Sequence, residues 1–175
     1  MRRYRYVYTP NDIAVFLLKA NLTMREENHV LRELWVEKIR IAKKYKLDEL
    51  KFRQAVRLEL ASYVLKKNDF DEFDLIMRDV GLKYTSLTPA QEYDFVFRYF
   101  KVVRLELLFL EGKDCHKIKL RRLLAHFSYK KDTQALVQDM QNVMAGLSLV
   151  TCLRGYVPCK ISEIGLDDMV MIRLE

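Results

Sequence analysis

The chain has 175 residues, half of them apolar, and carries 31 Lys and Arg against 24 Asp and Glu, for a net charge of +7. This length predicts one domain, or two small ones that share a core, and the interspersed charges argue against disorder. The apolar run 95–110 contains Arg98, Lys101, Arg104 and Glu106, which excludes a clean membrane span of about 20 residues. Three cysteines without a disulfide framework, and no signal peptide, predict a reducing, cytoplasmic location.

The chain opens with a basic and aromatic segment and two capped helices. Residues 1–8, MRRYRYVY, suit a short strand or an extended arm. Thr9 is the predicted N-cap of a helix that ends near Ala20, with Pro10 at its first position and Asp12 beside unpaired amides. Thr23, with Glu26 three residues later, predicts a capping box for a second helix that ends near residue 45.

Two further helices are predicted before the clearest break in the chain. Asp48 is the expected cap of the third, whose apolar stripe is formed by Leu50, Ala55, Leu58, Ala61 and Leu65. The fourth begins after Asn68 or Asp69 and ends at Gly81, a residue that takes positive φ cheaply. The polar segment 83–91 then separates the first half of the chain from the second.

The fifth helix is predicted over 89–111, after a cap at Thr88 and a capping box completed by Gln91. Apolar and aromatic side chains occupy most of its circumference, which is typical of a buried central helix. Gly112 closes it.

The last third changes from helix to strand. A short sixth helix is predicted to contain Ile118, Leu120, Leu123, Leu124 and Phe127, and a seventh, capped near Asp132, runs to about residue 147. Residues 149–153, 156–161 and 169–174 are rich in strand-forming side chains. Pro158 indicates that the middle one lies at a sheet edge or outside the sheet.

From residue 90 onward this order of elements resembles a winged helix-turn-helix. The resemblance is one of topology and rests on no diagnostic string. It implies that the second helix of the pair enters the major groove of DNA and that the strand hairpin lies beside the backbone or the minor groove. The residues of this second helix that face the DNA would be Thr133, Gln134, Gln138 and Gln141, since Gln can pair with adenine and Thr can contact a thymine methyl. Arg154, in the first hairpin turn, would be the cation of the wing.

Most of the excess positive charge is concentrated around this helix pair. Between Lys113 and Lys131 there are seven bases and one acid, Asp114, a local charge of +6. Such an excess attracts polyanions, although solvated helix faces also carry Lys and Arg. The predicted phosphate contacts are Lys117, Lys119, Arg121, Arg122, Lys130 and Lys131.

Several other patterns were weighed against simpler interpretations. Glu26 and His29 have the E-x-x-H spacing of carboxylate-bridged metal bundles, but the second copy that such a site needs is absent. Cys115, Cys152 and Cys159 contain no C-x2-C pair for zinc. No glycine-rich phosphate loop or nucleophile elbow occurs. The sequence therefore predicts no catalytic residue, no metal and no cofactor.

The combined prediction is a mainly α fold, with residues 1–84 as an N-terminal helical portion and residues 85–175 as a winged-helix-like portion. The C-terminal element is a small antiparallel β hairpin or a three-stranded sheet, and the 89–111 helix joins both cores. The predicted function is non-enzymatic binding of duplex DNA, as a regulator or an accessory factor of a mobile or phage-like element, with no membrane partner. The alternative is a helical adaptor or inhibitor that contacts another protein, or a homodimer formed through residues 1–8.

Overall fold

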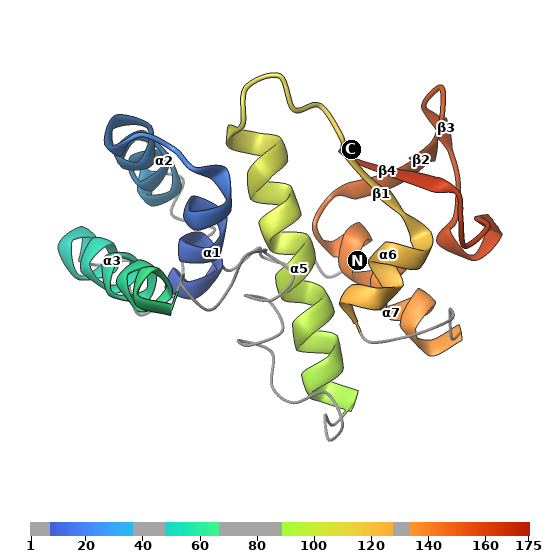
Figure 1. Cartoon of the computed structure of the whole chain (residues 1–175), viewed down its shortest axis with the longest axis horizontal. Coiled ribbons are helices and arrows are strands. Elements are labelled where there is room, and N and C mark those ends of the chain that lie inside the picture. Colours follow the sequence, from blue (N-terminus) through green and yellow to red (C-terminus); the bar gives the residue numbers. More distant parts are fainter. Residues whose placement is uncertain (1–7, 37–47, 67–88, 128–133) are drawn as a thin grey trace. The chain divides into compact units, whose positions relative to one another are not determined.

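A computed structural model describes residues 8–36, 48–66, 89–127 and 134–175 (Figure 1). The chain divides into two compact units, Met1–Ile76 and Met77–Glu175. The sequence predicts a boundary after residue 84, and both this boundary and the division between the units fall outside the described residues. That the 89–111 helix joins both cores stays a prediction.

The first unit contains three described helices, α1 (Pro10–Ala20), α2 (Met24–Val36) and α3 (Glu49–Lys66). Polar groups link α1 to α3, since Asn11 Nδ2 donates to Glu59 Oε2 at 2.9 Å and to the Tyr63 hydroxyl at 2.8 Å. The predicted extension of the second helix to residue 45, the whole fourth helix and the arm 1–7 lie outside the described residues.

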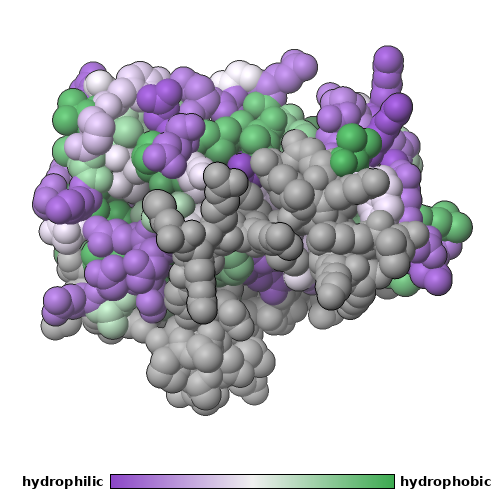
Figure 2. Space-filling model, turned by 180° about the vertical axis from the view of Figure 1, so that it is seen from behind, coloured by the Kyte–Doolittle hydropathy of each residue, from purple (hydrophilic) through white to green (hydrophobic). Residues whose placement is uncertain are grey.

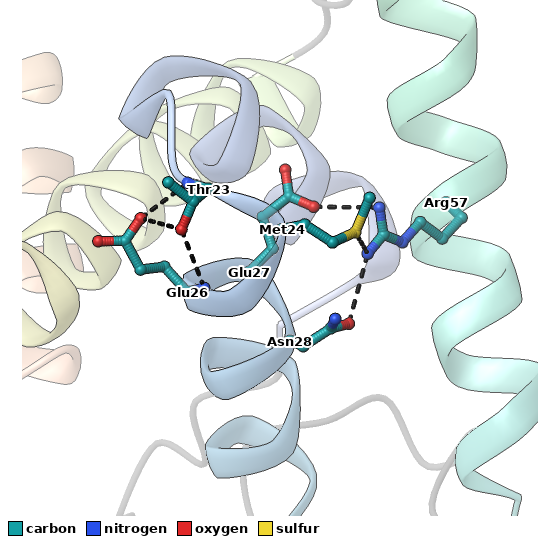
Figure 3. Close-up of polar contacts among 6 residues, drawn as sticks. All are labelled: Thr23, Met24, Glu26, Glu27, Asn28 and Arg57. Carbon is teal, nitrogen blue, oxygen red and sulfur yellow. Dashed lines mark hydrogen bonds and ion pairs between the residues drawn. The ribbon is translucent and has the colours of Figure 1, made fainter.

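Three of the N-caps predicted for this unit are confirmed, and the fourth, at Asn68 or Asp69, lies outside the described residues. Thr9 Oγ1 accepts from the Asp12 amide at 3.2 Å, and the Asp12 carboxylate accepts from the Thr9 amide at 2.9 Å, which completes a capping box. Thr23 and Glu26 make the same reciprocal pair (Figure 3). Asp48 Oδ1 accepts from the Lys51 amide at 3.0 Å. Local side chains therefore satisfy backbone donors that each helix start leaves unpaired.

Replacing Thr9 with Ala is expected to lower the free energy of unfolding by about 1 kcal/mol, because the Asp12 amide loses its acceptor at the start of a buried helix. Urea denaturation followed by circular dichroism measures the change. Ser62→Ala is the matched control, since it removes a hydroxyl from the exposed side of α3. Equal stability of the two variants would contradict a stabilising role for the cap.

The buried side of α3 differs from the predicted one. Phe52, Val56 and Tyr63 are buried, whereas Leu50 and Leu58 are 66% and 73% exposed. Trp35 of α2 stacks on Phe52 with ring centroids 5.9 Å apart and is itself half-buried. The helix carries two apolar rows, and the row with the aromatic side chains is the buried one, since aromatic rings remove the most apolar surface from water.

The second unit combines helices with a small antiparallel sheet. In chain order it contains α5 (Pro89–Phe109), β1 (His116–Lys119), α6 (Leu120–His126), α7 (Gln134–Gly146), β2 (Leu149–Leu153), β3 (Val157–Pro158), the short 3₁₀ helix η4 (Ile161–Glu163) and β4 (Met169–Leu174). The strands form one sheet in the order β1-β4-β2-β3, with every pair antiparallel. The protein is thus mainly helical with a C-terminal four-stranded sheet.

Two of the three predicted strands are confirmed with their predicted bounds, and the third is shorter than predicted. β2 and β4 occupy 149–153 and 169–174 as predicted. The segment 156–161 contributes only Val157–Pro158, which form the outer strand, because Pro158 has no amide to donate to a further strand.

The strand β1 was not predicted, and residues 116–119 are not part of the sixth helix. Ile118 is buried between the exposed Lys117 and Lys119, and it pairs with Val170, the second residue of β4. The helix begins only at Leu120. The apolar pattern of Ile118, Leu120 and Leu123 fits a continuous helix, and it also fits a strand followed by a helix. Pairing with β4 makes residues 116–119 a strand. The sheet therefore has four strands rather than two or three.

Candidate nucleic-acid interface

The structure describes eight of the eleven predicted contact residues, and seven of the eight are exposed. Lys117 and Lys119 lie on β1, Arg121 and Arg122 on α6, and Gln134 and Gln138 on α7. Arg154, at the turn between β2 and β3, is exposed as well, which makes seven. Lys130, Lys131 and Thr133 lie outside the described residues.

Alternation along β1 places its two lysines on one side of the sheet. Lys117 and Lys119 are two residues apart and exposed, while Ile118 between them is 7% exposed. Successive side chains of a strand point to opposite faces, so the two ammonium groups share a face and Ile118 anchors the strand. β1 is also the first strand in the sheet order, which leaves it one paired neighbour in the sheet.

An acid lies among these cations. The Arg121 guanidinium donates to Asp167 through Nε at 2.9 Å and Nη2 at 3.0 Å. This contact lowers the pKa of the Asp167 carboxyl and raises that of Arg121, and the charge of Lys119 contributes to the lowering. Lys119, Arg121 and Asp167 therefore lie close together, and Asp167 neutralises part of the positive charge that the sequence predicts for this segment.

The start of α6 is held by the loop before β4. The Leu120 amide donates to the Asp168 carbonyl at 3.1 Å, and the Arg121 amide donates to the Leu166 carbonyl at 2.7 Å. These two bonds occupy backbone donors at the helix start and orient the exposed Arg121 and Arg122.

The outward side of α7 is rich in amides and small residues. Leu136, Val137, Met140, Val143 and Met144 are buried, whereas Gln134, Ala135, Gln138, Asn142 and Ala145 are exposed. Gln138 Nε2 donates to Asn142 Oδ1 at 3.0 Å. Gln141, also predicted as a polar contact position, is half-buried. The exposed side chains of α7 therefore offer amide donors and acceptors, and none of them is charged.

The turn between β2 and β3 has an unusual backbone. Gly155 and Tyr156 have φ of 84° and 63°, and positive φ is rare for a bulky residue. The Tyr156 hydroxyl donates to Asp114 Oδ2 at 3.1 Å, and Arg173 lies 4.5 Å from its ring centroid. The bond lowers the pKa of Asp114 and raises that of Tyr156. These contacts hold the turn that carries Arg154.

A buried polar network, which the sequence does not predict, holds β1 against α5. Glu106 is fully buried and binds Lys113, and its Oε2 lies 3.3 Å from His116 Nδ1. His116 Nε2 lies 3.3 Å from the Tyr99 hydroxyl. An ionised carboxylate only accepts, so these distances fit donation from His116 Nδ1 to Glu106 together with acceptance by Nε2 from the tyrosine hydroxyl. The sequence held one signal of this network, since Glu106 is the single acidic residue in the apolar run 95–110.

The structure also describes Glu26 and the three cysteines, which the sequence offers as candidate metal ligands. Glu26 of the E-x-x-H pattern is used in the cap of α2, and its bonds to Thr23 lower its pKa. Cys115, Cys152 and Cys159 are free thiols, and burial raises the pKa of Cys159. Among the residues that the structure describes, no group of three His, Cys, Asp or Glu side chains is arranged to hold a metal ion.

In the described ranges, none of the helices combines the length and the apolar character needed to span a bilayer. Figure 2 shows one face of the chain, where hydrophilic side chains border separate hydrophobic patches. Comparisons with protein-family models, with curated proteins and with solved structures gave no match.

Proposed function

We propose that the second unit is a winged helix-turn-helix that binds duplex DNA without catalysing a reaction. The observation that carries this proposal is the arrangement of its elements. A helix, a strand, two helices and two longer strands follow in that order, with the two-residue β3 and the short η4 between the longer strands. The last strand, β4, pairs between β1 and β2. A winged helix has this order and this pairing, with the helix pair between its first two strands.

The exposed chemistry agrees with such a role. In a helix-turn-helix the second helix of the pair contacts base edges, and α7 presents Gln134, Gln138 and Asn142 outward. Side-chain amides pair with adenine in the major groove. Lys117, Lys119 and Arg122 lie on the preceding strand and helix, where they would contact phosphates rather than bases.

A salt titration of binding to a duplex of random sequence tests the proposal. Six phosphate contacts, from Lys117, Lys119, Arg121, Arg122, Lys130 and Lys131, predict a slope of about −5 for log affinity against log salt. Fluorescence anisotropy of a labelled duplex gives this slope. Absence of binding at low salt, together with capture of a protein ligand whose affinity depends little on salt, would favour the helical adaptor instead.

A further inference from the structure

The exposed row of α3 in the first unit has no role in the proposed DNA contact. Leu50, Gln54 and Leu58 are all exposed and follow at intervals of four residues, so they lie in one row along the helix. Ala61, one turn further, is exposed too. Two leucines with about seven-tenths of their surface in water, in one row, leave an apolar strip uncovered.

This row is symmetric about Gln54. Four residues before Gln54 lies one leucine, and four residues after it lies another. A two-fold axis that passes beside Gln54 would set two antiparallel copies of α3 together, so that Leu50 of each copy packs against Leu58 of the other. Such a self-complementary patch is what an isologous dimer requires. The two Gln54 amides would meet at the axis, where each can both donate and accept.

The surface beside the row has room for a partner's side chain. Arg53, Gln54, Arg57 and Leu58 line an open depression of about 480 Å³. Its walls are mainly the aliphatic parts of these side chains, which pack well against apolar groups while their heads stay in water. Met24, itself 63% exposed, extends the apolar surface, since its Sδ lies 3.2 Å from Arg57 Nη2 (Figure 3).

The charges around the row favour a second copy over an acidic ligand. Arg57 pairs with Glu27 at 3.0 Å, Arg53 with Glu49 at 2.8 Å and Lys51 with Asp48 at 3.2 Å. An acidic peptide would compete with these internal carboxylates for every one of the three cations. A second α3 brings an uncharged row to an uncharged row and leaves the three pairs intact.

We propose that the exposed Leu50–Gln54–Leu58 row of α3 is a homodimer interface, in which two copies of the chain pair antiparallel about Gln54. Because the row spans only about two helical turns, the contact is small, and the monomer and dimer should exchange with concentration.

Sedimentation velocity of the full chain over about a hundredfold range of concentration tests the pairing. The wild type should shift from monomer towards dimer, and Leu58→Glu should remain monomeric because it places a carboxylate against the partner's Leu50. Val157→Glu makes the same change at a residue that is 58% exposed in the second unit, and it should dimerise like the wild type. A wild type that stays monomeric throughout, or a Leu58→Glu variant that dimerises normally, would overturn the proposal.

Cross-linking tests the orientation separately. With Gln54→Cys, mild oxidation should yield a covalent dimer in which peptide mapping finds position 54 of both chains joined, because the axis passes between these positions. Lys51→Cys, at the edge of the row, is the control and should cross-link to itself much less. A dimer that is joined only through the native cysteines would contradict the antiparallel arrangement. Both tests omit DNA, so their outcome does not depend on the proposed function.

Discussion

Replacing both Lys117 and Lys119 with Glu is expected to lower the affinity for duplex DNA by at least about tenfold at moderate salt, and to reduce the magnitude of the salt slope by about 2. Both side chains are exposed on one face of β1, while the buried Ile118 between them holds the strand. Charge reversal should therefore leave the fold intact while it removes two phosphate contacts and adds repulsion. Fluorescence anisotropy across a salt series measures both quantities.

The control for this prediction must separate local contact from overall charge. Arg25→Glu with Arg32→Glu changes the net charge by the same amount on exposed positions of α2. If only general attraction matters, both double variants should lose affinity equally, and the proposed interface would be wrong. If β1 contacts phosphates, the α2 variant should keep a slope near that of the wild type.

A substitution at Asp167, beside the same cations, is expected to raise the affinity for duplex DNA. Since its carboxylate binds Arg121 and lies near Lys119, Asp167→Asn should release Arg121 for phosphate and raise duplex affinity a few-fold. Because the folded-state pKa of Asp167 is lowered, its ion pair persists at neutral pH and is lost only as pH falls through that lowered value. The wild type should therefore approach the affinity of Asp167→Asn in acid.

The second large effect concerns stability and is expected at Glu106. Glu106→Gln should lower the free energy of unfolding by about 2 kcal/mol, because it leaves Lys113 and His116 without the buried carboxylate that they bind. The loss should stay below the full cost of an isolated buried charge, since Lys113 is 29% exposed and can turn towards water. Urea denaturation of the full chain measures it.

Glu111→Gln is the matched control, since it makes the same change at an exposed position five residues later. Unchanged stability of that variant, with a clear loss in Glu106→Gln, would assign the effect to the buried network. Equal stability of both variants would show that the α5–β1 contact does not depend on the Glu106 charge.

Local signals in the sequence determined the starts of the three helices that the structure describes in the first unit. Thr9 with Asp12, Thr23 with Glu26, and Asp48 each act within one helical turn, so the residues that make the cap are also those that reveal it. The strands β2 and β4 were predictable for a similar reason, since each combines strand-forming side chains with turn residues beside it.

Only the tertiary structure decided which apolar row of α3 is buried and where the sixth helix begins. The sequence offers both Leu50–Leu58 and Phe52–Val56–Tyr63 as helical rows, and packing buried the second. Residues 116–119 form a strand because β4, which begins fifty residues after Lys119, supplies its hydrogen-bond partners. Caps and turns are local in the chain, whereas burial and strand pairing depend on groups distant in sequence, and therefore the first could be predicted and the second could not.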